Sequence, residues 1–493
     1  MHSPDTDPAS WLDAFARSHP DRLFLRTPDG QHLTYAAMTQ RVDHVAAALA
    51  QRAVVAGDRV VAQVEKSPDA IALYLACLRL GAVFVPLNTA YTTAEVEYFL
   101  GDAEPKLAVG VATDGVPLAE LVRNESPQAR ARADVKQSDL AALLYTSGTT
   151  GRSKGAMLTR ANLANNALTL AHAWRFSERD VLLHALPIFH VHGLFVAINT
   201  VLAAGSSMLF LPKFDADEVV RLLPEATVMM GVPTFYTRLL QHPGFTRERC
   251  EKIRLFVSGS APLLAETHRE FRAHTGHAIL ERYGMSETLM NTSNPYEGER
   301  VAGSVGPPLP GVEVRIADPE SGHALPEAES VGMIEVRGPN VFRGYWRMPE
   351  KTAAEFRKDG FFITGDVGRL DRNGYLFIVG RAKDLIISGG YNVYPVEVEM
   401  ELDAVSGVVE SAVIGVPHPD FGEGVTAVVV ARAGAALDEH TLRTALEQRL
   451  AKYKLPKRIV FVSEMPRNAM GKVQKAQLRE RYRDLYNPPR PKH

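Results

Sequence analysis

Short apolar runs that end in glycine or proline alternate with helical patterns over the part of the chain before Gly303. Residues 71–87, IALYLACLRLGAVFVPL, read as a helix closed by Gly81 and then as a strand that ends at Pro86. Similar buried runs with a turn at the carboxyl end lie at Ser207–Pro212, Ala226–Pro233 and Ile253–Pro262. This alternation predicts an α/β fold whose parallel sheets carry helices on both faces. Ligands of such sheets bind beyond the carboxyl ends of the strands, where these Gly, Ser and Pro residues fall.

The pattern changes after Gly303, where short strands punctuated by Gly and Pro read as hairpins, with Asn373-Gly374 as a turn dipeptide. Beyond Arg381 a new α+β pattern begins, with a helix expected over Leu442–Lys452. We therefore predict a large domain over residues 1–380, with parallel-rich sheets flanked by helices and a small β-barrel-like subdomain. A small α+β domain is predicted over residues 385–493, and residues 381–384 join the two.

Composition excludes several classes of protein. The 493 residues are 46% apolar and 23% charged, with a formal charge of -2, which is typical of a soluble globular protein and disfavours a nucleic-acid binder. Two cysteines, Cys77 and Cys250, exclude a disulfide framework and fit a reducing compartment. No signal peptide or membrane span is expected, so the predicted location is cytoplasmic. From Ala451 onward 12 Lys or Arg face 3 Asp or Glu, which predicts either a solvated basic face or a site for an anion.

The segment Tyr145–Gly155, YTSGTTGRSKG, directly follows the apolar run Leu140–Leu144. Gly148 and Gly151 allow the backbone to approach an anion closely, and Lys154 offers a mobile positive charge. Hydroxyl donors come from Thr146, Ser147, Thr149 and Thr150. The spacing G-x-x-G-x-x-K differs from that of a Walker loop. The segment predicts a polyphosphate-binding loop, with a polar surface turn as the alternative.

Five motifs in order then resemble one family. They are YTSGTTGRSKG (145–155), ERYGMSET (281–288), TGD (364–366), GRAKDLIISGGYNVYPVEVE (380–399) and PRNAMGKVQK (466–475). Together they resemble the adenylate-forming acyl-CoA ligases of the ANL superfamily, with one departure, Ser286, where many members have Thr. The resemblance implies an enzyme that joins a carboxylate to the α-phosphate of ATP, releases pyrophosphate, and passes the acyl group to the thiol of CoA, with Mg²⁺ present.

The resemblance also implies roles for individual residues. Glu287 is expected to bind Mg²⁺, with a surface acid as the alternative, and Asp366 to accept hydrogen bonds from the ribose hydroxyls. Tyr283 is expected to stack on adenine opposite Gly259, Ser260 and Ala261, although a lone aromatic is more often a core residue. The full set expected to contact the nucleotide is Thr146, Ser147, Gly148, Thr149, Thr150, Lys154, Gly259, Ser260, Ala261, Glu281, Tyr283, Gly284, Met285, Ser286, Asp366, Arg381 and Lys472.

A second group of implied roles concerns the small domain. Lys472 resembles the lysine that contacts both the carboxylate and the α-phosphate, where a lysine judged alone would be solvated. Lys383 resembles the hinge about which this domain rotates between half-reactions. Gly389 and Gly390 would then line a narrow tunnel for CoA, or form an ordinary turn. Acetylation of Lys472 by a lysine acetyltransferase would remove its charge and inactivate the enzyme.

Two arginines indicate the acid. Pro233 is expected to start a helix in which Phe235, Arg238 and Leu239 share a face, so that the Arg238 guanidinium needs an anionic partner. Arg282 precedes the expected adenine-stacking residue. Two cations converging on one pocket would suit the distal carboxylate of a small dicarboxylate, unless they pair with internal acids such as Glu281. His190 matches a position near the reacting carboxylate, or is a packed core histidine.

Three stretches resemble the malonate-activating subgroup of the family, the malonyl-CoA synthetases. They are RYGMSETLMNTSNPYEGER (282–300), GPNVFRGYWRMPEKT (338–352) and ESAVIGVPHPDFGEGVTAVVV (410–430). The leading substrate is therefore malonate, with methylmalonate as a second candidate. The alternatives are a short- or medium-chain acyl or aryl ligase, or a stand-alone adenylation enzyme that loads a carrier protein. A non-catalytic relative that binds nucleotide or acyl-CoA is a third hypothesis, which the complete set of expected site residues disfavours.

Overall fold

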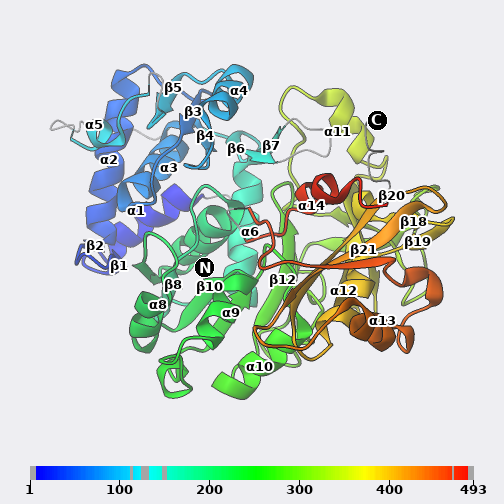
Figure 1. The fold of residues 1–493 in the computed structure, drawn as a ribbon. Coiled ribbons are helices and arrows are strands. Elements are labelled where there is room, and N and C mark those ends of the chain that lie inside the picture. The colour runs from blue at the N-terminus through cyan, green and yellow to red at the C-terminus, as the bar shows by residue number, and fades with distance from the viewer. Residues whose placement is uncertain (1–6, 112–114, 124–132, 147–152, 469–470, 487–493) are drawn as a thin grey trace, which may run out of the picture.

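The computed structural model describes residues 7–111, 115–123, 133–146, 153–468 and 471–486. Their strands form four sheets, and the fold is α/β as predicted (Figure 1). In the same part of the chain, no helix combines the length and the apolar character needed to cross a membrane. The C-terminal strands and helices, coloured orange to red, lie on the opposite side of the view from α1 to α5, coloured blue to cyan (Figure 1).

The largest sheet has eight strands, and its interior pairs are all parallel. In spatial order the strands are β13 (Leu289–Ser293), β12 (Leu280–Met285), β11 (Leu255–Ser258), β10 (Val228–Gly231), β8 (Val181–His184), β9 (Ser207–Phe210), β1 (Leu23–Arg26) and β2 (His32–Thr34). Only the two edge strands, β13 and β2, pair antiparallel. The predicted runs at 207–212, 226–233 and 253–262 are thus confirmed as β9, β10 and β11, each slightly shorter than its apolar run.

A second sheet has five strands. Its order is β5 (Leu107–Val109), β3 (Arg59–Ala62), β4 (Val83–Pro86), β6 (Leu140–Thr146) and β7 (Lys154–Thr159). All pairs are parallel except β6 with β7, where Thr146 lies opposite Lys154. The predicted phosphate loop therefore joins two strands of one hairpin, so both of its ends are fixed in the same sheet.

Helices follow most of these strands. The helices of residues 7–355 are α1 (Pro8–Ser18), α2 (Tyr35–Gln51), α3 (Pro68–Leu80), α4 (Thr93–Ala103), α5 (Leu118–Val122), α6 (Arg160–Ala173), η1 (His192–Ile198), α7 (Asn199–Ala204), α8 (Ala216–Leu222), η2 (Leu223–Glu225), α9 (Pro233–Leu240), η3 (Glu248–Cys250), α10 (Ala265–Thr275) and α11 (Pro349–Glu355). In α3 the Ser67 side chain accepts the Ala70 N–H at the start, and Gly81, with φ of 74°, ends the helix as predicted.

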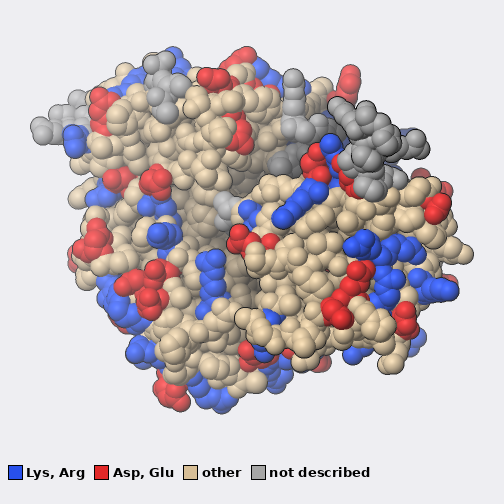
Figure 2. Space-filling model, viewed as in Figure 1, with Lys and Arg blue, Asp and Glu red and all other residues tan. Residues whose placement is uncertain are grey.

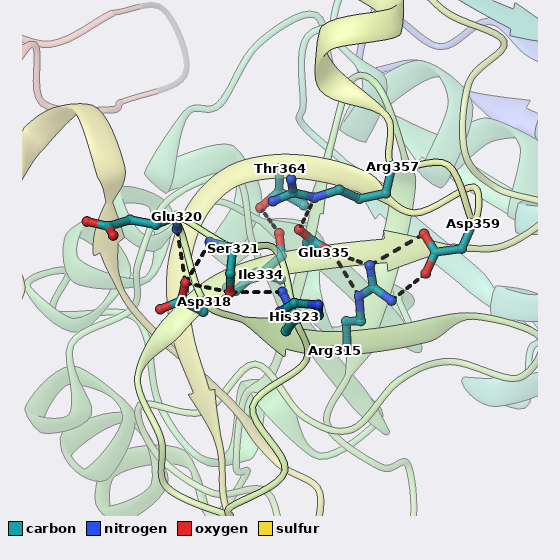
Figure 3. A network of polar contacts seen from close by, with 10 residues as sticks. All are labelled: Arg315, Asp318, Glu320, Ser321, His323, Ile334, Glu335, Arg357, Asp359 and Thr364. Atoms are coloured by element: carbon teal, nitrogen blue, oxygen red, sulfur yellow. Dashed lines mark hydrogen bonds and ion pairs between the residues drawn. The ribbon is translucent and has the colours of Figure 1, made fainter.

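A four-stranded antiparallel sheet follows, formed by β14 (Glu313–Ala317), β15 (Gly332–Arg337), β16 (Phe362–Leu370) and β17 (Leu376–Arg381). Its edge strands β14 and β17 do not pair with each other among the described residues. Fully buried Glu335 ties its strands together, since it accepts hydrogen bonds from Arg315 (2.8 Å) and Arg357 (2.7 Å) (Figure 3).

The C-terminal part has its own sheet and core. After η4 (Ala382–Asp384), where the predicted boundary falls, come β18 (Ile386–Ser388), β19 (Tyr391–Val393), α12 (Pro395–Asp403), β20 (Val408–His418), β21 (Gly422–Ala431), α13 (Glu439–Glu447), η5 (Lys452–Lys454), β22 (Arg458–Phe461) and α14 (Lys475–Tyr482). The helix expected over Leu442–Lys452 thus begins and ends earlier than predicted.

Candidate active site

Many of the residues predicted to act lie at the carboxyl ends of β6, β11 and β12, and others lie in β16, in β17 and in the C-terminal part. The space-filling view shows a hollow near the centre of one face, with Lys and Arg side chains at its rim (Figure 2). Open α/β sheets bind their ligands at this end of the strands.

The phosphate loop is described only at its two ends. Lys154 is buried, and its ammonium lies 3.1 Å from Glu355 Oε1 and 4.6 Å from the ring centre of Tyr345. Ser147, Gly148, Thr149 and Thr150 lie outside the described residues.

Glu287 is buried close to this lysine. Its Oε1 lies 3.4 Å from the Thr146 hydroxyl and 3.1 Å from the Tyr345 hydroxyl. Burial raises the pKa of Glu287. A carboxylate beside a hydroxyl fits Mg²⁺, which usually takes one or two protein carboxylates and the oxygens of substrate phosphates. When bound there, the ion would neutralise phosphate charge.

Tyr345 and Glu355 were not predicted. The Tyr345 hydroxyl donates to Glu355 Oε2 at 2.7 Å, and Lys351 lies 2.8 Å from Glu355 Oε1. The only signal in the sequence was the four-residue spacing of Lys351 and Glu355, which is common on any helix surface.

Asp366, Arg381 and Tyr283 meet although they lie far apart in the chain. Asp366 of β16 pairs with Arg381 of β17, at 2.8 Å between Oδ1 and Nε, and accepts a hydrogen bond from the Tyr283 hydroxyl. The Asp366 carboxylate raises the pKa of Arg381, and burial and Asp366 hold the pKa of Tyr283 well above its usual range. The ring and the acid predicted for the nucleoside are thus adjacent.

Other predicted nucleotide residues surround the end of β12. Buried Glu281 accepts the Leu263 N–H at 3.1 Å, and burial raises its pKa to about 8. A Cβ at Gly284 would lie 1.9 Å from the Leu289 carbonyl oxygen, so only glycine fits the turn into β13. Ala261, Met285 and Ser286 are half-buried.

Arg282 is a buried cation, 3% exposed, whose Nε and Nη2 have no hydrogen-bond partner among the described residues. Burial lowers its pKa to about 9. A Cβ at Gly259 would lie 2.4 Å from Arg282 Cζ, so this glycine makes room for the guanidinium. Glu281 Oε1 accepts the Leu263 N–H rather than a hydrogen bond from Arg282.

Two histidines lie near Arg282. Burial, Arg282 and Lys472 lower the pKa of half-buried His190 to about 4, so its imidazole is neutral at pH 7. His192, which was not predicted, is fully buried, with Nδ1 3.2 Å from the Ser260 hydroxyl. Ser260 has a φ of 72°, a left-handed conformation that is strained for a serine and common at functional sites.

Arg238 is exposed, so the apolar face predicted for it on α9 is wrong. That helix instead buries Tyr236 and Leu239. Arg238 lies one turn beyond Thr234, on the same side of α9. Thr234 faces the C-terminal part, because a Cβ at Gly471 would lie 2.9 Å from its hydroxyl. Arg238 thus borders the space between the two parts of the molecule.

Lys472 stands in a tight loop, where its N–H donates to the Asn468 side chain at 3.0 Å. The residue keeps exposed surface, yet the protein around its ammonium and the nearby Arg381 lower its pKa to about 8, against an opposing effect of Asp366. Lys472 also contributes to the lowered pKa of His190. The lysine therefore approaches the predicted carboxylate and nucleoside residues together.

Lys383 is exposed in η4, at the junction of the two parts. Gly389 and Gly390 are exposed in the turn from β18 to β19, with φ of 60° and 81°. A two-residue turn with both φ positive accounts for these glycines without a tunnel. Their role toward CoA stays a prediction.

The sheets and this arrangement of cations, carboxylates and a buried tyrosine are typical of a nucleotide-dependent α/β enzyme. Models of the AMP-binding enzyme family match residues 12–346, and models of its C-terminal domain match residues 397–472. The chain belongs to this family, the ANL superfamily of adenylate-forming enzymes, and is an AMP-forming acid–CoA ligase that uses ATP, Mg²⁺ and CoA.

The relatives that are similar to the chain are named for different acid substrates. A mitochondrial malonate–CoA ligase of Mus musculus is 40% identical over 81% of this chain and 77% of the relative. A feruloyl-CoA synthase of Amycolatopsis sp. is 36% identical over 96% of this chain and 98% of the relative. The crystal structure of ATP-bound MatB from Rhodopseudomonas palustris has 56% identity and a TM-score of 0.94, covering 98% of this chain and 100% of MatB. Apo MatB has a TM-score of 0.83 over the same shares of the two chains.

Proposed function

We propose that the enzyme converts malonate, ATP and CoA to malonyl-CoA, AMP and pyrophosphate, with methylmalonate as a second substrate. One malonate carboxylate oxygen attacks the α-phosphorus and pyrophosphate leaves. The thiolate of CoA then attacks the acyl carbon, and the C–O bond to AMP breaks. Malonate–CoA ligases among the relatives support this assignment, although a feruloyl-CoA synthase is similar over more of the chain.

The buried Arg282 carries the substrate assignment. A guanidinium without a partner in the protein interior is costly, and a carboxylate ligand would supply the missing hydrogen bonds. We assign Arg282 to the distal carboxylate of malonate, with Arg238 extending toward the same space from α9. A ligase for an apolar acid would instead need an apolar slot where Arg282 lies.

The other predicted residues keep their proposed roles. Lys154 would hold the β- and γ-phosphates, and Glu287 would hold Mg²⁺. Asp366 would accept hydrogen bonds from the ribose hydroxyls in place of its present contacts with Tyr283 and Arg381. Lys472 would neutralise charge where the carboxylate meets the α-phosphate, because two anions must approach there. Neutral His190 would donate or accept a hydrogen bond beside the reacting carboxylate.

The second half-reaction would need a different domain arrangement. Rotation at Lys383 would withdraw Lys472 and bring Gly389 and Gly390 to the large domain. The greater similarity to ATP-bound than to apo MatB supports a first-step arrangement here. We further propose that acetylation of Lys472 would abolish this step, which a fully active acetylated sample would refute.

Pyrophosphate release tests the substrate. The wild-type enzyme should prefer malonate and methylmalonate over succinate, acetate, octanoate and benzoate, and should transfer the acyl group to CoA rather than to a carrier protein. Arg282→Met or Arg238→Ala should shift the preference toward monocarboxylates. Wild-type preference for octanoate or benzoate would exclude the distal-carboxylate assignment and favour the acyl or aryl alternative.

A further inference from the structure

The charge of Lys154 is balanced by an acid from a distant segment. Lys154 is only 7% exposed, and its ammonium lies 3.1 Å from Glu355 Oε1 at the end of α11. The two residues are 201 positions apart, so the fold and not the local sequence makes this pair. A buried ammonium is stable only with such a partner, because leaving water is costly for a charge.

Polar contacts fix the position of Glu355. No side chain of α11 is buried, so apolar packing holds this helix weakly. The Glu355 carboxylate accepts from the Tyr345 hydroxyl at 2.7 Å and pairs with Lys351 at 2.8 Å, while its side chain stays 20% exposed. Glu355 therefore has a second cation, Lys351, at the surface.

A polyphosphate on Lys154 would compete with this carboxylate. The phosphates would bring further negative charge to an ammonium that Glu355 already neutralises, and two anions this close repel each other. We propose that Glu355 is a built-in counter-ion that holds Lys154 while the polyphosphate site is empty, and that ATP displaces it onto Lys351. The inference rests on the proposed role of Lys154 toward the β- and γ-phosphates.

This exchange has a consequence for turnover. Once pyrophosphate has formed, return of Glu355 to Lys154 would favour the departure of pyrophosphate. The carboxylate would then restore the ion pair that the phosphates had replaced. AMP lacks the β- and γ-phosphates, so it would neither displace Glu355 nor be affected by it. Glu355 thus acts on affinity for polyphosphates alone.

The test is equilibrium binding by calorimetry, with α,β-methylene-ATP as an unreactive polyphosphate and AMP as its counterpart. Glu355→Gln keeps the size and the hydrogen bond from Tyr345 but removes the charge. It should bind α,β-methylene-ATP about three- to tenfold more tightly than wild type, with AMP affinity unchanged. Glu355→Asp, too short to hold both lysines, should shift affinity in the same direction by less.

Glu350→Gln is the matched control, because Glu350 is an exposed acid on the same helix. It should leave both affinities unchanged, which separates the Lys154 contact from a general change in surface charge. Unchanged or weaker binding of α,β-methylene-ATP by a folded Glu355→Gln enzyme would overturn the counter-ion role.

Lys154→Met separates this inference from the proposed function. It should weaken α,β-methylene-ATP binding, and adding Glu355→Gln should then have no further tightening effect. If Lys154→Met alone leaves the affinity unchanged, the assignment of Lys154 to the polyphosphate is wrong. If Lys154→Met weakens binding but Glu355→Gln does not tighten it, only the counter-ion role fails.

Discussion

The charge of Lys472 is the residue-scale feature most open to experiment. Its pKa of about 8 means that the ammonium form, needed beside the carboxylate and the α-phosphate, is lost as pH rises through that value. The rate of adenylation should therefore fall by about tenfold per pH unit above pH 8. Pyrophosphate release measures this rate. Thioester formation from preformed adenylate should not follow this profile.

Lys472→Ala should abolish adenylation and largely spare the second step. Lys452→Met, which removes an exposed charge from the same basic segment, should leave the pH profile of pyrophosphate release unchanged. Equal loss of both half-reactions in Lys472→Ala would contradict the role proposed for this lysine.

Gly259 controls the position of the buried guanidinium. In Gly259→Ala the new methyl group would overlap Arg282 Cζ, so the guanidinium must move. We expect the KM for malonate to rise by about tenfold or more, and the KM for ATP to rise less. Gly101→Ala, at a helical glycine with open space around it, should change neither KM. A rise confined to ATP would mean that Gly259 serves the nucleotide alone.

Contiguous motifs predict which residues could act, but they do not predict contacts that depend on the fold. Asp366 and Arg381 were identified by their motifs, and the hairpin of β16 and β17 brings them together. Glu355 and His192 could not be found, because a glutamate on a surface helix and a histidine in an apolar run have no distinctive pattern. Arg238 was misplaced because helix periodicity gives spacing but not which side of α9 is covered.

At the scale of elements, Glu335 stabilises the four-stranded sheet (Figure 3). It is fully buried between Arg315 and Arg357, whose side chains are 22% and 28% exposed. Glu335→Gln would take the acid from Arg357 and leave Arg315 with Asp359 alone, and it should lower the free energy of unfolding by about 2–4 kcal/mol, measured by urea denaturation. Ile334 precedes Glu335 in β15. Its carbonyl accepts a hydrogen bond from the Thr364 hydroxyl, which in turn accepts the Asp366 N–H. A change at Glu335 should therefore also disturb Asp366 and raise the KM for ATP.

Glu313→Gln is the control within the same sheet. Glu313 pairs with Arg337 at the surface, where solvent screens both charges, so its loss should lower the free energy of unfolding far less than the loss of Glu335. A similar loss of stability in both variants would show that burial of Glu335 is not what matters.

The parallel sheets were predictable because buried strands and capped helices leave clear local patterns, as α3 with Gly81 illustrates. The order of the strands was not, since β8 lies between β10 and β9 through long-range packing. Hairpin signals likewise predict neighbouring pairs but do not say whether the edge strands β14 and β17 meet.

At the scale of the whole molecule, Lys383 allows a test of domain rotation. Proline fixes φ, so Lys383→Pro should hold the present arrangement without touching the sites. Adenylation should be retained and thioester formation should fall by about tenfold or more, measured in separate half-reactions. Lys383→Ala, which keeps the backbone free, should preserve both. Full thioester activity in the proline variant would exclude a hinge at this position.

The buried Arg282 guanidinium, whose Nε and Nη2 have no hydrogen-bond partner among the described residues, should limit the thermal stability of the enzyme. No acid among the described residues pairs with this buried cation, so the folded enzyme gives up thermostability in order to be ready for its substrate. The Arg282→Met enzyme should therefore melt at a higher temperature than wild type and should lose activity on malonate. Its free energy of unfolding should rise by about 1–3 kcal/mol. Calorimetric melting without ligands would reveal this trade-off, and an unchanged or lower melting temperature would show that the cation is compensated in solution.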